Sequence, residues 1–250
     1  MMSCVGLSLF REDQNPKTDK GMHTYKDFGL KMYYYNPGTP QIEEHNIQVP
    51  FSNKSMRMSG VFGGPFYTER QFVAKFTMGD MGYQQWDSVR SKIDNLYHGM
   101  VVKIVSDLDK GYYYLGTLNF EYEKEYYAES DVVLTCIADP YKYAVRGPSD
   151  KWLWDTFNFV NGVIRYIGEQ MITAQNNKIK IVAGEMETAV IVNVKTMTSS
   201  SMTVSCDGEK ITLKLGKNRI PDIRVGGKEE KTLIFSGTGT VEIDYREGRL

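Results

Sequence analysis

Gln71-Phe-Val-Ala-Lys-Phe-Thr-Met78 is the segment that decides the fold class of this chain. Phe72, Ala74, Phe76 and Met78 recur at every second position, which predicts a β-strand with one buried face. Short segments of similar character lie on both sides, at 30–35, 100–105, 112–115, 117–123 and 131–138. The region from about residue 28 to 143 is therefore predicted to be mainly β.

One helix is predicted between Gly82 and Gly99. Its apolar residues Trp86, Val89, Ile93 and Leu96 recur at steps of three and four, which places them in one stripe on a helix. Gly99 occupies the position where a left-handed residue commonly ends a helix. The N-terminal domain, over residues 22–143, is therefore expected to be mainly β with one α-helix.

A linker is predicted at residues 144–150, where a Gly-Pro pair and charged residues argue against regular structure. The composition then changes from aromatic-rich to rich in Val, Ile, Thr and Ser. Short strands with glycine turns are predicted at 189–195, 201–206, 210–215, 231–236 and 240–245. Regularly spaced short strands without a helix predict an antiparallel β-sandwich over residues 151–250.

The first 21 residues are expected to form a flexible leader. The segment 11–21 is polar, contains Pro16 and Gly21, and shows no periodicity. Met22 follows directly and could be a downstream start. Residues 1–10 have no basic lead-in, which argues against a secretory signal.

Composition excludes several classes of protein. The chain has 250 residues, 30 basic and 31 acidic side chains and a formal net charge of -1, which argues against specific nucleic-acid binding. Mean hydropathy is -0.40 and no long uncharged apolar run occurs, which argues against a membrane span. Three widely spaced cysteines form neither a disulfide framework nor a metal cluster, so folding is expected in a reducing cytoplasm.

No metal site or cofactor is predicted. Glu43-Glu-His45 contains ligand types, but neighbouring residues on a strand point to opposite faces, so at most two could converge. Asp107-Leu-Asp-Lys-Gly111 begins like a calcium loop, yet Leu118 stands where the closing glutamate belongs. The second segment is predicted to be a charged hairpin turn with Gly111 at positive φ.

No catalytic residues are predicted either. Glu121, Glu123 and Glu125 alternate along one strand and are expected to form its solvated side, not a facing pair of catalytic acids. Cys136 is expected to be a core thiol, because it shares a strand face with Val132 and Leu134. The chain carries no phosphate-binding loop, dinucleotide fingerprint or nucleophile elbow. The sequence therefore predicts a protein that is not an enzyme.

Trp152 and Trp154 are the candidate contact residues of the second domain. Two residues apart on a strand, they could stack on a sugar or anchor a partner. The competing interpretation is a plug that closes one end of the sandwich, since Phe157 and Phe159 continue the apolar series. Burial of the two tryptophans distinguishes a structural role from a carbohydrate-binding one.

The chain resembles the distal tail protein (Dit) family of long flexible-tailed bacteriophages and prophages. Segments at 25–30, 66–70, 96–99, 102–105, 112–116, 138–143 and 235–248 carry the resemblance through their order and spacing. The most telling are Pro140-Tyr-Lys-Tyr143 and Gly237-Thr-Gly-Thr-Val241.

This resemblance implies a structural hub at the virion tail tip, without catalysis. Its N-terminal domain would be a β-sandwich with one α-helix that closes into a homohexameric ring continuing the tail tube. Its C-terminal domain would be a galectin-like β-sandwich. The implied partners are further copies of the chain, the tail tube protein, the tail-associated tip protein and receptor-binding or baseplate proteins. The 17 tyrosines, nearly all before residue 150, suit a ring-forming domain. The alternative is a carbohydrate-binding protein that uses the C-terminal sandwich.

Overall fold

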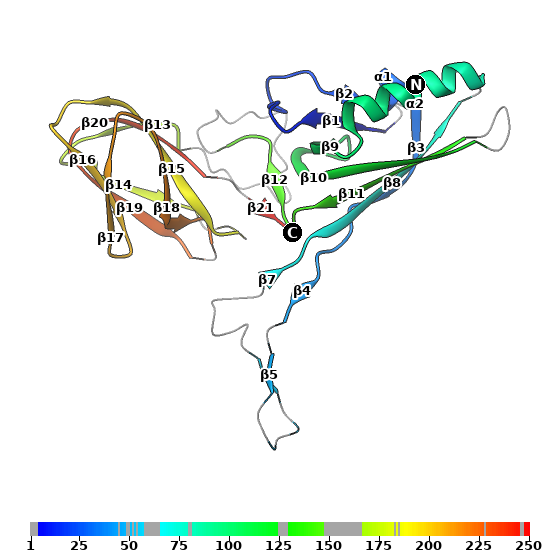
Figure 1. Cartoon of the computed structure of the whole chain (residues 1–250). Coiled ribbons are helices and arrows are strands. Elements are labelled where there is room, and N and C mark those ends of the chain that lie inside the picture. Colours follow the sequence, from blue (N-terminus) through cyan, green and yellow to red (C-terminus); the bar gives the residue numbers. More distant parts are fainter. Residues whose placement is uncertain are drawn as a thin grey trace. The chain divides into compact units, whose positions relative to one another are not determined.

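The computed structural model describes residues 5–44, 46–48, 51, 53, 55–57, 66–79, 82–124, 130–147, 167–182, 184, 186–227, 229–245 and 248–250. The chain forms two compact units (Figure 1). The first comprises Met1–Asp109, Tyr113–Lys142 and Leu250, and the second comprises Lys110–Tyr112 and Tyr143–Arg249.

One antiparallel sheet forms the body of the first unit. Its strands follow the order β2-β1-β9-β10-β11-β8-β3. They are β1 (Leu7–Arg11), β2 (Met22–His23), β3 (Leu30–Asn36), β8 (Arg70–Met78), β9 (Val101–Ser106), β10 (Asp109–Glu123) and β11 (Asp131–Ala138). Two further strands lie off this path, because β12 (Lys142–Ala144) pairs with β10 and with β21 (Gly248–Arg249).

The core of the first unit lies between one face of this sheet and helix α2 (Tyr83–Tyr97). Phe72, Ala74, Phe76 and Met78 of β8 are fully buried, as their period of two predicts. The predicted stripe of α2 also faces this core: Ile93 is buried, and Trp86, Val89 and Leu96 pack against it partly exposed. Gly99 adopts φ +73°, as predicted for the residue that ends the helix.

The expected flexible leader is wrong for Leu7–Arg11. This segment is strand β1, which pairs with both β2 and β9, and Leu7 and Leu9 are 0% and 1% exposed. The polar run that follows does not disrupt β1, because Lys103 Nζ donates to the carbonyls of Glu12 and Gln14 at 2.6 Å. The loop is thereby fastened to β9.

A second helix, α1 (Thr24–Phe28), was not expected, and its five residues are too short to show a helical period. Local hydrogen bonds stabilise it instead. The His23 ring Nδ1 accepts from the backbone N–H groups of Tyr25 and Lys26, and the Asp27 carboxylate accepts from the His23 N–H. This is a reciprocal cap of the helix N-terminus.

The turn between β9 and β10 lies at Asp107–Leu108, so the hairpin prediction is confirmed there. The predicted positive φ of Gly111 is wrong. The register between β9 and β10 shifts between Asp109 and Tyr113, and this bulge takes up Gly111 without left-handed backbone.

Between β3 and β8 the chain leaves the sheet as a hairpin arm (residues 37–69). Its base is the ladder of β4 (Ile42–Glu43) with β7 (Phe66–Tyr67), and its outer part is the ladder of β5 (Asn46–Gln48) with β6 (Ser55–Arg57). Figure 1 shows β4 and β7 leading away from the main sheet toward β5.

The second unit is an antiparallel sandwich of two four-stranded sheets, as predicted (Figure 1). One has the order β13-β20-β15-β18, from β13 (Glu169–Ile172), β20 (Gly239–Asp244), β15 (Thr188–Met197) and β18 (Gly216–Val225). The other has the order β14-β19-β16-β17, from β14 (Lys178–Ile181), β19 (Lys231–Ser236), β16 (Met202–Cys206) and β17 (Glu209–Leu213). Their apolar side chains meet in one core.

The mainly β fold class is thus confirmed. The domain limits expected from the sequence stay predictions, because residues 148–166 are outside the described part of the chain.

Candidate assembly surface

The two predicted contact residues, Trp152 and Trp154, lie outside the described residues. The two roles considered for them, stacking on a sugar and closing one end of the sandwich, therefore stay predictions. His45 and Glu125 fall outside as well.

The residues considered for catalysis are placed as core and surface groups. Cys136 is 0% exposed, and burial raises the pKa of its thiol to about 12, so its thiolate is suppressed at neutral pH. Glu121 and Glu123 are exposed on β10, with Phe120 buried on the other face. Among the described residues, no group of three His, Cys, Asp or Glu side chains could hold a metal ion. No helix in the same ranges is long and apolar enough to cross a membrane.

The hairpin arm exposes large apolar side chains. Ile42 and Ile47 are each 55% exposed, and Phe51 is fully exposed at φ +63°, an unusual conformation for a residue with a side chain. A two-stranded hairpin is marginally stable on its own in water. The exposed apolar groups on this element make it a candidate contact surface.

The root of the arm is fixed by a buried cation, Arg70, the first residue of β8. Its side chain donates to the carbonyl of Gly38, where the arm begins, and to the carbonyl of Pro140, after β11. The guanidinium also lies over the Tyr114 ring, 5.4 Å from its centroid. Arg70 thereby joins three backbone segments at the point where the arm leaves the sheet.

This arrangement leaves Arg70 without a carboxylate partner among the described residues. The residue is only 4% exposed, and its Nε has no hydrogen-bond acceptor. Burial lowers the pKa of the guanidinium, while Tyr114 and Tyr35 act in the opposite direction. A buried charge with neutral partners costs free energy, so its contribution is to the geometry of the arm rather than to stability.

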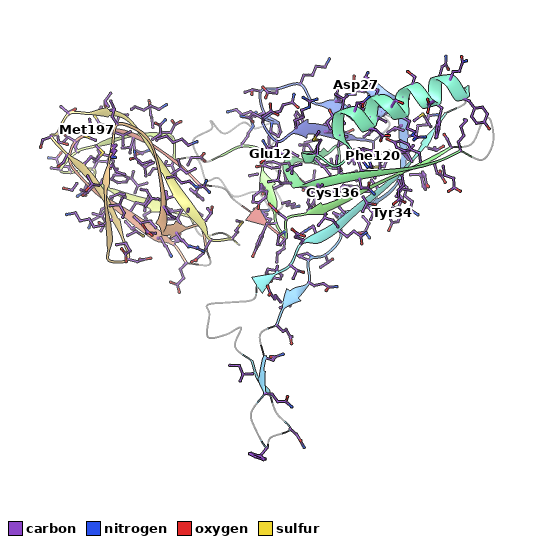
Figure 2. The ribbon with its side chains drawn as sticks, in the orientation of Figure 1. Glu12, Asp27, Tyr34, Phe120, Cys136 and Met197 are labelled. Carbon is purple, nitrogen blue, oxygen red and sulfur yellow. The ribbon has the colours of Figure 1, made fainter. Side chains whose placement is uncertain are left out.

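The face of the main sheet opposite the core forms a second exposed surface. Phe120 lies on the side of α2 and Tyr34 on the other side (Figure 2). On this second side Tyr34, Val101 and Ile137 are between 38% and 48% exposed. Aromatic and β-branched residues among polar ones are typical of interfaces.

Sequence reasoning missed the arm. Strands β4 and β5 of the arm are exposed along their whole length, so no alternation of buried and exposed residues marks them. The one available signal was the separation of the two adjacent strands β3 and β8 by more than thirty residues, far beyond an ordinary hairpin loop.

These features define a class of protein, a mainly β chain of two units whose first unit exposes apolar groups on a hairpin arm and on one face of its sheet. No family model and no curated protein sequence matches the chain. Among solved structures, the Dit (gp 19.1) protein of phage SPP1, described as a paradigm of the hub adsorption apparatus in phages infecting Gram-positive hosts, is similar. The TM-score is 0.60 at 10% identity, covering 98% of this chain and 99% of that chain.

A structure of the phage P2 baseplate in its activated conformation with calcium aligns over 98% of both chains. Its identity is 9% and its TM-score is 0.45. The likeness to the SPP1 protein shows the fold, and at that level it confirms the resemblance to distal tail proteins.

Proposed function

We propose that this protein is a structural component of a bacteriophage tail tip, a baseplate hub without catalytic activity. In this proposal six copies form a ring that joins the tail tube to the tip and its receptor-binding apparatus. The partners are further copies of the chain, the tail tube protein, the tail-associated tip protein and receptor-binding or baseplate proteins. The chain folds in the host cytoplasm and ends in the virion.

The observation that carries the proposal is the near full-length likeness to a hub protein. Both units of this chain take part, since the match covers 98% of it. An isolated sandwich would support only a fold, because sandwiches serve many functions. A sheet that carries a hairpin arm, combined with a separate sandwich in the same chain, is a more specific arrangement than a sandwich alone.

The surface of the first unit supports assembly independently. A closed ring needs complementary surfaces on the two flanks of each subunit. The arm supplies one apolar surface through Ile42, Ile47 and Phe51, and the sheet face with Tyr34 and Ile137 supplies a candidate receiving surface.

Light scattering coupled to size-exclusion chromatography tests the proposal. The expected particle has about six times the 28.6 kDa mass of one chain. The arm variant Ile42→Asp with Ile47→Asp should elute as a monomer at the same concentration, with its circular dichroism spectrum unchanged. Met171→Asp with Leu215→Asp is the matched control, because these second-unit residues are 67% and 68% exposed.

Two results would count against the proposal. A wild-type chain that stays monomeric at high concentration and also when mixed with tail tube protein would exclude a ring. A control pair that dissociates the particle as completely as the arm pair would remove the arm from the interface.

A further inference from the structure

One outer face of the second unit has an unusual composition. In the sheet β14-β19-β16-β17, alternate side chains point into the core, and the others point outward. The outward side chains are Lys178, Lys180, Thr203, Ser205, Lys210, Thr212, Thr232, Ile234 and Ser236. They comprise lysines, hydroxyl residues and one isoleucine, with no carboxylate. This set is called the lysine–hydroxyl face.

The register of the sheet aligns these residues across all four strands. Lys178 is opposite Ile234, Ile234 is opposite Ser205, and Ser205 is opposite Lys210. With strands spaced about 4.8 Å apart, the row places its two lysine Cα atoms roughly 14 Å from each other. Lys180 lies two residues along β14 from Lys178 and widens the cationic area. No described residue forms an ion pair with these three lysines.

The opposite sheet of the same sandwich does not share this separation of lysines from carboxylates. On its outer face Lys195 Nζ pairs with Glu242 at 2.9 Å, and Glu169 lies directly opposite Glu242. Lys217 and Arg219 lie on its edge strand β18. Ordinary soluble surfaces intersperse both signs in this way, whereas the lysine–hydroxyl face carries one sign alone.

We propose that the lysine–hydroxyl face binds a linear polymer, other than a nucleic acid, whose negative charge is carried by phosphate groups along its backbone. An ammonium group is a compact point charge that serves as a phosphate binder, and this face carries lysines and no arginine, whose fork fits both carboxylate and phosphate. Single-stranded nucleic acid needs aromatic side chains on which its bases stack, and the face has none. Hydroxyl groups beside the lysines offer donors to phosphate oxygens and to the linking units.

The proposed contact is electrostatic and therefore depends on salt. Each phosphate neutralised by a lysine releases counterions, so the logarithm of the binding constant falls linearly with the logarithm of salt concentration. Binding by three lysines on a flat face should be weak at physiological salt and measurable at low salt. A polymer that spans the row gains from several contacts at once.

The test measures binding of the full chain to fluorescently labelled inorganic polyphosphate by anisotropy at several salt concentrations. The triple variant K178Q/K180Q/K210Q should bind on the order of a hundredfold more weakly at low salt. Its salt slope should be less steep by about 2. The matched control is K217Q/R219Q/R224Q, which removes the same charge from exposed positions on the other sheet and should bind like wild type.

Parallel binding measurements with other polymers test whether the face prefers phosphate over other charged groups. Poly-glutamate, a single-stranded DNA oligonucleotide and neutral dextran should all bind more weakly than polyphosphate. Equal losses in the two triple variants would show that net charge, not this face, governs binding. Equal affinity for poly-glutamate or DNA, or no binding of polyphosphate at low salt, would overturn the proposal. Unchanged unfolding temperatures would show that both variants fold.

Discussion

The two units of the chain bury their apolar residues in different ways. In the second unit two sheets face each other and enclose Val192, Val204 and Phe235 between them. In the first unit one sheet is covered on its core side by helix α2, while its other face and the hairpin arm expose Tyr34, Ile47 and other large apolar residues. In the second unit the two sheets cover each other, whereas the first unit leaves one sheet face and the arm as surfaces that a neighbouring molecule can cover.

This difference tells where each type of partner is expected. Exposed apolar groups favour close packing against another protein, and these gather in the first unit. Exposed charge of one sign favours a soluble or polymeric ligand of opposite sign, and this occurs on the second unit. The predictions below test whether the two units are independent in the way that this comparison requires.

Removing β1 should have the largest effect. A chain that starts at Met22 lacks a strand that pairs on both sides, together with the buried Leu7 and Leu9. Loss of one buried leucine typically costs 2–5 kcal/mol, so losing both approaches the whole stability of a domain, about 5–15 kcal/mol. Calorimetry should show that the transition of the first unit disappears while that of the second remains. Two intact transitions would show that β1 is dispensable.

A matched pair of core substitutions should have the next largest effect. Phe72 in the first unit and Phe235 in the second are 0% and 1% exposed. Each change to alanine should cost about 3–5 kcal/mol through lost burial and the cavity left behind. In calorimetry Phe72→Ala should lower only the first-unit transition, and Phe235→Ala only the second. Equal shifts of both transitions by either variant would mean that the units unfold as one.

The parts of the fold that the sequence predicted share a local signal. Phe72 to Met78 and Val190 to Val194 alternate between core and surface, and each alternating run is a strand in the structure. Helix α2 was predictable in the same way, because its apolar residues recur at the steps of three and four that place them on one face of a helix. These signals arise because one face of each element is buried by its own unit.

Two of the missed parts, β18 and the hairpin arm, lack that signal for identifiable reasons. Strand β18 contains Pro221 and Asp222, and the register shift opposite Ala189 and Val190 accommodates them, so its buried residues do not alternate. In the hairpin arm, strands β4 and β5 are exposed along their whole length, so their residues carry no pattern of burial in the chain's own core. The sequence gives no local signal for the candidate assembly surface, because its residues are not buried by the chain's own core.

Alkaline pH should destabilise the first unit more than the second. Burial raises the pKa of Tyr35, Tyr97, Tyr114 and Tyr122, and that of the Cys136 thiol to about 12. Above pH 9 to 10 the unfolded chain loses these protons while the folded chain keeps them, so stability falls as pH rises. Each such group contributes at most about 1.4 kcal/mol per pH unit.

The measurement is calorimetry of the wild-type chain at pH 8 and pH 10.5. The first-unit transition should move to lower temperature by more than the second, in which the groups with a raised pKa among the described residues are Cys206, Lys195 and Lys231. A larger shift of the second transition would contradict the assignment of the buried phenols.

The smallest effects are expected from glycine substitutions at two turns. Gly38 at the arm root and Gly208 in the second unit both have positive φ, at +67° and +94°. A side chain at Gly38 would also collide with the carbonyl oxygen of Gln71, whereas none would be met at Gly208, which follows Asp207 in a tight hairpin turn. Gly208→Ala should therefore cost about 1 kcal/mol through backbone strain alone, and Gly38→Ala about 2–3 kcal/mol.

Urea unfolding followed by tyrosine fluorescence for the first unit, and by circular dichroism for the whole chain, measures both changes. Equal free-energy costs at the two positions would show that the backbone at the arm root shifts to accommodate the added methyl group. That result would contradict the inference that the Arg70 contacts hold the arm in a fixed direction.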